Sequence, residues 1–406
     1  MITEEMEDIL IERILQRQIK ANEKILKEIG KVLGEIGELS PSNAYTIKQQ
    51  IKYGESLDKI VKILSETSKI NQKEIYKMLE NDAIINLNKT KKYFKAKNLD
   101  FIPYEENIPL KQKVMEVASA TLKEYSNISR TAGLRFLNSK GKVVSKGIKE
   151  AYKEIIDDAI LNVSTGKQSF YEALKDQLET IGSYGVRSLQ YEEGYSRRIE
   201  SAMRMNIQDG LNRLSIAQQE LVGNQFDSDG WEVTVHANPA PDHERVQGHI
   251  FSNKEFAKLQ EFDYFGVIKD IDGNVYMRDG FAKIRPIGQL NCYHRANAIV
   301  IGVDKPLYTE EQLKKIREEN NKKIEYNGRE YTKYEATQIQ RRLETELRRT
   351  REEKITLKAG NQSGNLNDKI SKLTKRERHL LEEYHKLSKI GGLAEKLERT
   401  RVLTNR

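Results

Sequence analysis

The start of the chain carries an apolar stripe with the period of an α-helix. From Glu4 to Ile36, isoleucine, leucine and valine recur at three- and four-residue steps, which places them on one helix face. The proline in Ser40–Asn43 ends this pattern, because the residue before a proline is pushed out of the α region. We therefore expect a helical first half, a bundle with extended arms, with further helices at about 44–64, 71–87, 110–130, 145–162, 167–182 and 195–222.

The pattern changes after Gly223. Trp231, Val233 and Val235 alternate with polar residues, and this period of two predicts a strand. A proline-rich turn follows, then a short helix near 253–261, a glycine-rich hairpin-like stretch, DIDGNVYMRDGF, and the apolar strand AIVIGV. These elements together predict a compact α+β module.

The helical pattern returns after this module. Thr309 and Gln312 have the spacing of a capping box, which predicts the start of a helix. A second helix carries apolar residues four positions apart, and a flexible break at 361–365 precedes a last helix at about 366–389. Arginine and glutamate occupy the outer faces of these helices, so we expect a charged two-helix arm.

These patterns predict a mainly α protein with a small α+β module. The expected regions are an extended helical region at 1–222, a compact α+β module at 223–308 and a charged helical tail at 309–406. The composition agrees, because 37% apolar and 32% charged residues in a chain of 406 suit long amphipathic helices better than one thick globule.

Charge and cysteine content narrow the classes of function. The net charge is 69 − 61 = +8, a mild excess that tolerates nucleic acid but does not indicate a dedicated DNA-binding domain. A single cysteine excludes an intrachain disulfide framework and fits synthesis in a reducing cytoplasm. The sequence shows no signal-peptide pattern and no apolar run of the ~20 residues that a transmembrane helix needs, so we expect a soluble protein without membrane contact.

The α+β module concentrates the rare residue types. It holds four of the six histidines and the only cysteine, and His236, His243, Cys292 and His294 are candidate ligands for a structural zinc ion. Their spacing is not a standard zinc pattern. The alternative, which we favour, needs no cofactor: a polar, hydrogen-bonded knot that joins the proline-rich turn to the last strand.

Enzymatic interpretations have less support. Asp242 next to His243 could form a catalytic pair, and Cys292 with His294 could act as nucleophile and base. A general base needs a cleft and an orienting partner, and the sequence indicates neither. Ser164–Ser169 resembles the end of a phosphate loop but lacks its upstream glycine, so it predicts a turn between helices.

Arginines in the tail are the candidates for contact with nucleic acid. Arg341, Arg342, Arg348 and Arg349 could follow DNA phosphates, but glutamates alternate with them along the same helix. A self-paired, solvated helix face is therefore the better interpretation, and only weak contact without sequence preference is expected.

Several motifs together resemble the phage minor capsid protein 2 family, over most of the chain. The resemblance is carried by the helix entry YEEGYSRRIESAMRMN, by VHANPAPDHERVQGHIFS, by GQLNCYHR and by the tail helix YNGREYTKYEATQIQRRLE. The residues that match the family motifs are Tyr191, Gly194, Ala202, Arg204, His236, Pro241, Asp242, His243, Gln247, Gly248, Asn291, Cys292 and His294. Ala240 and Tyr293 depart from the pattern, since relatives usually have arginine there.

The resemblance implies a structural protein of the virion that is present in few copies. It would lie inside the head near the portal, contact portal or capsid proteins, act in head assembly, DNA packaging or ejection, and touch the packaged DNA weakly. Asp242, Gln247, Gly248 and Asn291 would then serve the module's structure and not catalysis. The rival hypothesis is a metal-dependent hydrolase or transferase effector that uses the His/Cys module.

Overall fold

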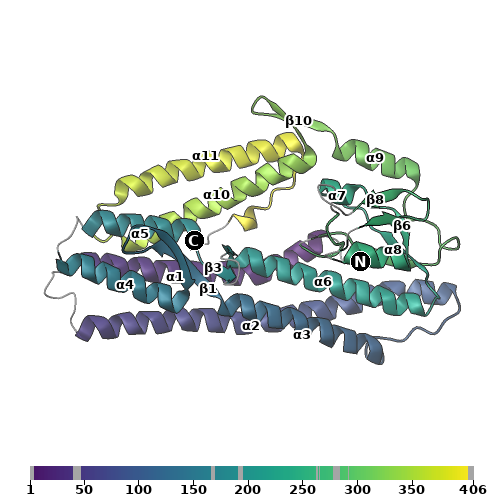
Figure 1. Ribbon diagram of the computed structural model, residues 1–406, viewed down its shortest axis with the longest axis horizontal. Coiled ribbons are helices and arrows are strands. Elements are labelled where there is room, and N and C mark those ends of the chain that lie inside the picture. Colours follow the sequence, from purple (N-terminus) through teal and green to yellow (C-terminus); the bar gives the residue numbers. More distant parts are fainter. Residues whose placement is uncertain are drawn as a thin grey trace. The chain divides into compact units, whose positions relative to one another are not determined.

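The structure is a computed structural model that describes residues 4–39, 47–165, 170–190, 195–261, 264, 266–277, 284–290 and 292–400 (Figure 1). It is 65% helical with small antiparallel sheets, which confirms the predicted class, mainly α with a small α+β module. Ser164–Ser169, for which we predicted a turn, lies mostly outside the described residues. In the part of the chain that the structure describes, no helix is long and apolar enough to cross a membrane.

Contacts divide the chain into two compact units. Unit 1 consists of Met1–Ile11, Lys73–Glu124 and Arg204–Gln338, and unit 2 consists of Glu12–Gln72, Tyr125–Met203 and Ile339–Arg406. Each unit thus combines segments that are far apart in the sequence. The boundaries predicted after residues 222 and 308 remain predictions.

Helix α1 (Glu4–Gly37) confirms the predicted first helix and lies in the core of unit 2 from Glu12 onward. Five residues of its apolar stripe are fully buried, Ile25, Leu26, Ile29, Leu33 and Ile36, whereas Ile9 near its start is exposed. Gly30 and Gly34 pack against the backbone of α10 (Lys333–Gly360), where an added Cβ would lie 2.6 Å from the carbonyl oxygens of Thr356 and Gly360 respectively. These two glycines therefore permit close contact between the two helix backbones.

Helices α10 and α11 (Asn367–Gly391) confirm the predicted tail helices and the break between them. They lie side by side within unit 2 (Figure 1). Gln340 donates to Ser388 Oγ (2.8 Å), and Tyr384 donates to Glu344 Oε1 (3.3 Å). Both helices have one buried face, so they contribute to the unit 2 core.

Unit 2 also contains a four-stranded antiparallel sheet, which the sequence patterns did not predict. The strands are β1 (Ala132–Leu137), β2 (Val143–Gly147), β3 (Arg187–Gln190) and β4 (Tyr195–Arg198), in the order β2-β1-β3-β4. Helices α4 (Ile148–Thr165) and α5 (Phe170–Tyr184) contact β1. The helices predicted to begin at 145 and 195 therefore begin a few residues later, after strands.

Buried charges cross-link the segments of unit 2. Arg348 on α10 pairs with Glu200, the second residue of α6 (Ile199–Asn224), at 2.8 Å. Asn22 of α1 donates to the other carboxylate oxygen of Glu200 at 3.2 Å. Arg198 of β4 pairs with Glu352 of α10. One polar network thus joins α1, β4, α6 and α10.

Helix α2 (Ile47–Ala96) is continuous, so the predicted break between 64 and 71 is wrong. Asn71, a polar residue at the expected break, has a tertiary partner. Asn71 is fully buried and donates to the hydroxyl of Tyr125 at 2.8 Å. Helix α3 (Ile108–Arg130) lies where predicted, and Asn107 caps it by accepting from the backbone N–H of Leu110 (3.0 Å).

The α+β module of unit 1 has a three-stranded antiparallel sheet in the order β6-β5-β9, formed by β6 (Ile250–Ser252), β5 (Gly230–Val233) and β9 (Ala296–Ile299). Helix α8 (Asn253–Gln260) and the hairpin β7 (Val267–Lys269)–β8 (Val275–Met277) complete its core, as predicted. Trp231 stacks on Phe256 with ring centroids 4.7 Å apart. The sheet is therefore anchored on α8 by an aromatic pair.

The last strand lies earlier than the AIVIGV pattern predicted. Strand β9 ends at Ile299, and the following residues turn back, because Asp304 accepts from the backbone N–H of Val300 at 2.7 Å. Helix α9 (Glu310–Asn320) begins with the predicted capping box of Thr309 and Gln312. An unpredicted hairpin, β10 (Lys323–Tyr326) and β11 (Arg329–Thr332), separates α9 from α10.

Candidate functional site

The sheet register brings the proline-rich turn and the segment before β9 together. Val233 of β5 pairs with Ala296 of β9, and the two chains continue beside each other beyond the sheet, where Thr234 N–H donates to the carbonyl of Arg295 at 2.8 Å. His243 lies on α7 (Pro241–Glu244), which starts with a proline in its first turn. Cys292 and His294 lie just before β9. Asn291 lies outside the described residues.

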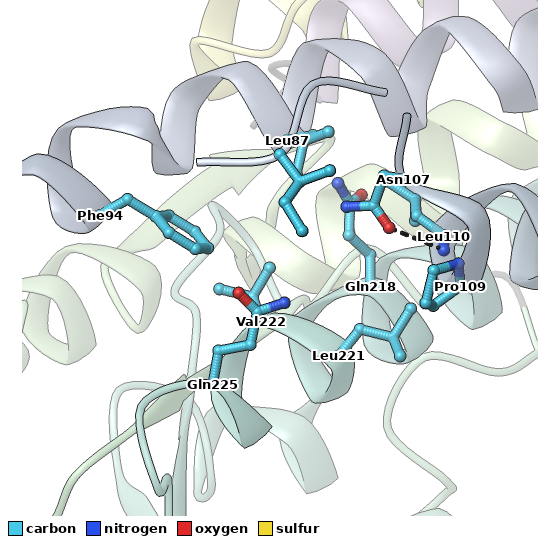
Figure 2. A pocket seen from close by; sticks show the side chains of 10 residues that line it. Leu87, Phe94, Asn107, Pro109, Leu110, Gln218, Leu221, Val222 and Gln225 are labelled. Carbon is cyan, nitrogen blue, oxygen red and sulfur yellow. Dashed lines mark hydrogen bonds between the residues drawn. The ribbon is translucent and has the colours of Figure 1, made fainter. Parts of the chain in front are cut away.

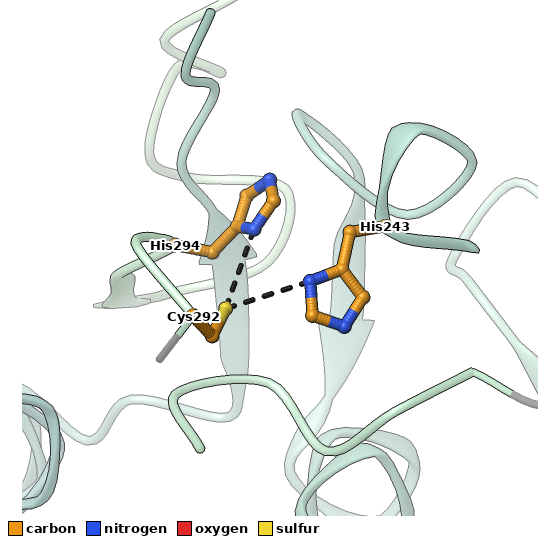
Figure 3. Close-up of side chains that lie close together, drawn as sticks. All are labelled: His243, Cys292 and His294. Atoms are coloured by element: carbon orange, nitrogen blue, oxygen red, sulfur yellow. Dashed lines mark hydrogen bonds between the residues drawn. The ribbon is translucent and has the colours of Figure 1, made fainter. Parts of the chain in front are cut away.

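His243, Cys292 and His294 converge on one point, and we call them the Cys292 triad (Figure 3). The sulfur of Cys292 lies 3.5 Å from Nδ1 of His243 and 3.4 Å from Nδ1 of His294. The three side chains are buried, with 4%, 6% and 1% of each residue exposed. Two histidines thus direct the same ring atom at one sulfur.

The outer ring nitrogens of both histidines have oxygen partners. His243 Nε2 lies 3.0 Å from the backbone carbonyl of Arg285, and His294 Nε2 lies 3.2 Å from Oε1 of Gln247. The same Oε1 accepts from the backbone N–H of His236 at 3.3 Å. Both rings are therefore held in orientation from outside the triad.

Asp242 is bound to an arginine. Its carboxylate accepts from the Arg285 side chain at 2.9 Å through both oxygens, and from the Arg285 backbone N–H at 3.0 Å. Burial opposes ionisation, but Arg285 outweighs it and lowers the pKa of Asp242. Asp242 Oδ2 is 3.7 Å from His243 Nε2, beyond hydrogen-bond distance. The arrangement supports a structural role over the catalytic pair considered above.

The electrostatics of the triad also disfavour nucleophilic chemistry. Burial raises the pKa of the Cys292 thiol to about 11. Burial, followed by the neighbouring His236 and His243, lowers the pKa of His294 well below its ordinary value. A reactive cysteine needs a depressed pKa and a cationic neighbour, and these shifts run in the opposite direction.

Other motif residues support the triad from the turn. Gln247 is buried, and its Oε1 contacts the His236 backbone N–H and His294 Nε2. Gly248 adopts a positive φ of +76°. A Cβ at Gly248 would lie 2.2 Å from Leu313 Cδ2, so a side chain has no room there. His236 is half-buried, with its ring centroid 4.1 Å from that of His294, and its Nδ1 lies 2.9 Å from the carbonyl of Ala237.

Three further residues position the site, and the sequence patterns did not predict them. The Arg285 side chain donates to Asp242, and its backbone carbonyl accepts from His243 Nε2. Asn212 of α6 donates to the backbone carbonyl of Cys292 at 2.6 Å. Tyr293 donates to Asp8 Oδ1 at 3.0 Å. Asn212 and Asp8 are far from the motif in sequence, so no local signal pointed to them.

The four candidate arginines of α10 do not form one surface. Arg348 is bound to Glu200 and to the carbonyl of Arg399. Arg341, Arg342 and Arg349 are exposed, and Arg349 lies 3.8 Å from Glu346. Of the four, only these three can reach phosphates.

The architecture can now be compared with known proteins. A family model described as Phage minor capsid protein 2 matches residues 8–384. The chain belongs to the phage minor capsid protein 2 family. No curated protein and no solved structure matches it. The family match confirms the resemblance found in the sequence, and it makes this minor capsid chain a structural phage protein.

The match covers segments of both units as well as the α+β module. The Cys292 triad therefore lies within the matched range of residues. The family assignment favours a structural role for the site, in agreement with its buried geometry.

Proposed function

We propose that this chain is a low-copy component of the phage head that associates with the portal and acts in head assembly, DNA packaging or ejection. The observation that carries the proposal is the family match over residues 8–384 of 406. The buried, high-pKa thiol and the arginine-bound Asp242 add support, because they favour structure over chemistry. No observation favours the hydrolase or transferase alternative.

A contact surface for a protein partner lies at the α2–α3 connection of unit 1. Ile108 and Met115 are 65% and 62% exposed, and seven residues apart on α3 they share one face. Leu99 and Ile102, in the same connection, are also exposed. Exposed apolar residues gathered in this way are typical of interaction surfaces.

A small hollow with mostly apolar walls adjoins this connection. Its volume is about 100 Å³, and its walls include Leu87, Phe94, Pro109 and Val222 (Figure 2). Ligand pockets usually have roughly 300–1,000 Å³, so this hollow suits an anchoring side chain of a protein partner better than a substrate. The partner we propose is the portal protein or a neighbouring capsid protein.

The test is incorporation into heads. The phage is complemented with wild-type chain, with Ile108→Lys/Met115→Lys, or with Val303→Lys, a matched control that is 71% exposed elsewhere in unit 1. Purified heads and isolated portals are then probed for the chain. We expect wild type and the control in heads and with portals, and strong depletion of the double variant.

Two outcomes would contradict these statements separately. Wild-type chain absent from heads would overturn the head-protein proposal. Double-variant chain that is folded by circular dichroism and enters heads as wild type does would overturn the α2–α3 surface alone.

A further inference from the structure

The Cys292 triad has the spacing of ligands around a tetrahedral metal ion. Zinc binds sulfur at about 2.3 Å and imidazole nitrogen at about 2.0–2.1 Å, so a sulfur and a nitrogen on one tetrahedral ion lie about 3.6 Å apart. The observed distances from Cys292 Sγ to Nδ1 of His243 and of His294 are 3.5 and 3.4 Å. All candidate ligand atoms of the triad lie within 4.8 Å of one another. Both sulfur–nitrogen distances therefore already match those around one tetrahedral ion.

The hydrogen bonds determine which ring nitrogens carry protons. A backbone carbonyl can only accept, so His243 Nε2 must donate to Arg285. The backbone N–H of His236 can only donate, so the Gln247 atom it meets is the amide oxygen. His294 Nε2 must therefore donate to that oxygen as well. In the neutral form of each ring, Nδ1 is then a lone pair that faces Cys292.

Without a metal, and with both rings neutral, the triad has one donor hydrogen for two acceptor nitrogens. The Cys292 thiol carries one hydrogen and can donate it to only one of the two Nδ1 atoms, so the other nitrogen faces a sulfur lone pair. A cation among the three atoms satisfies all of them at once. The outer N–H groups that donate to oxygens also match the second shell of metal-bound histidines, which fixes ring orientation and raises ligand basicity.

We propose that Cys292 Sγ and the Nδ1 atoms of His243 and His294 bind one Zn²⁺ ion. Thiolate and imidazole donors select zinc over magnesium or calcium, which prefer oxygen. Binding displaces the thiol proton of Cys292 to solvent, so the sulfur coordinates as thiolate. The remaining tetrahedral position falls to water or to His236, whose ring lies 4.1 Å from that of His294.

The ion would have a structural role. It would join α7 to the segment before β9, closing a loop of 49 residues between His243 and Cys292. Burial of all three ligands separates the site from substrate-sized molecules. The same contacts that form the polar knot would then be reinforced by coordination, and the metal would stabilise the module because it binds the ligands gathered in the folded chain and not the unfolded chain.

The experiment uses the full-length protein. Metal is stripped with a chelator, Zn²⁺ is restored, excess is removed, and bound metal is measured by mass spectrometry. Co²⁺ is loaded in parallel, because thiolate ligation gives a charge-transfer band in the near ultraviolet and tetrahedral geometry gives strong visible bands. We expect one ion per wild-type chain and both spectral features. Cys292→Ser should lose the ion and the charge-transfer band, and the control His385→Gln, at an exposed histidine of unit 2, should keep both.

A second measurement, on the wild-type protein, tests the proposal even if the Cys292→Ser variant does not fold. The chain has one cysteine, so alkylation followed by mass spectrometry reports on Cys292 alone. Zn²⁺ should slow alkylation of the wild-type protein strongly, and Mg²⁺ should not. The proposal is overturned if wild type binds no zinc, if Zn²⁺ leaves alkylation unchanged, or if a folded Cys292→Ser variant binds zinc as tightly as wild type.

Discussion

Replacing Glu200 by glutamine removes one anion from the buried polar network of unit 2. Glu200 is 3% exposed, and its carboxylate contacts Arg348 at 2.8 Å, Asn22 at 3.2 Å and Arg198 at 3.9 Å. The amide keeps the shape and one acceptor, but it leaves the two guanidinium groups without this counter-charge. Breaking a buried pair in this way costs about 3–5 kcal/mol.

Glu346→Gln is the matched control. Glu346 lies on α10, as Arg348 does, and it also faces two arginines, Arg376 at 2.6 Å and Arg349 at 3.8 Å. Its side chain is 36% exposed, so its loss should cost only about 0–1 kcal/mol. The free energy of unfolding of both variants and wild type is measured by denaturant titration followed by circular dichroism. Equal losses of stability in the two variants would refute the assignment of Glu200 to a desolvated network.

The pH dependence provides an independent check. Burial opposes ionisation of Glu200, but Arg348 and Arg198 outweigh it and lower its pKa below the ordinary value of 4.5. Because the pKa is lower in the folded chain, the carboxylate's contribution is present above 4.5 and is lost as pH falls through the folded value. The stability difference between wild type and Glu200→Gln should therefore shrink in acid. A difference that grows below pH 4.5 would contradict the sign of this shift.

Two further predictions concern packing and DNA. Gly30→Val should destabilise the protein by about 1–3 kcal/mol, because its Cβ would lie 2.6 Å from the Thr356 carbonyl; an unchanged melting temperature would contradict the close approach of the two helices. Replacing Arg341, Arg342 and Arg349 by glutamine should weaken DNA binding in a low-salt gel-shift assay. The slope of log affinity against log salt should become less steep by up to about 0.9 for each phosphate that the variant no longer binds. Tight wild-type binding that prefers one sequence would show a dedicated DNA-binding function.

Local signals were sufficient for the helices that carry them. The apolar stripe of α1 and the Thr309 capping box each lie within one element, so their prediction needed no knowledge of neighbours. The strand beginning at Gly230 was also predicted, but the alternation does not show which of its polar residues are buried. Glu232 is buried because its carboxylate accepts from the backbone N–H of Leu307 at 2.7 Å. An isolated strand could not reveal that partner.

The hairpin β10–β11 has a local sequence signal of its own. Asn327 and Gly328 both have positive φ, at +49° and +75°, and form the tight turn between β10 and β11. Asn-Gly between alternating residues is a strong indication of a hairpin. The hairpin was not predicted because helical patterns flank this Asn-Gly pair on both sides. Strands β1 to β4 are four to six residues long, too short for alternation to stand out in a helical region.

The sequence by itself determined the helical class, the positions of helices such as α1 and α9, and the gathering of the only cysteine with four histidines in one module. It also carried the resemblance to the phage minor capsid protein 2 family, which the match over residues 8–384 confirmed. It did not select Arg285, Asn212 or Asp8 as supports of the site, nor separate Arg348 from its exposed neighbours. Those relations depend on contacts between residues far apart in the chain, and only the tertiary structure decides them, because distance in space follows from sheet register and helix packing and not from spacing along the chain.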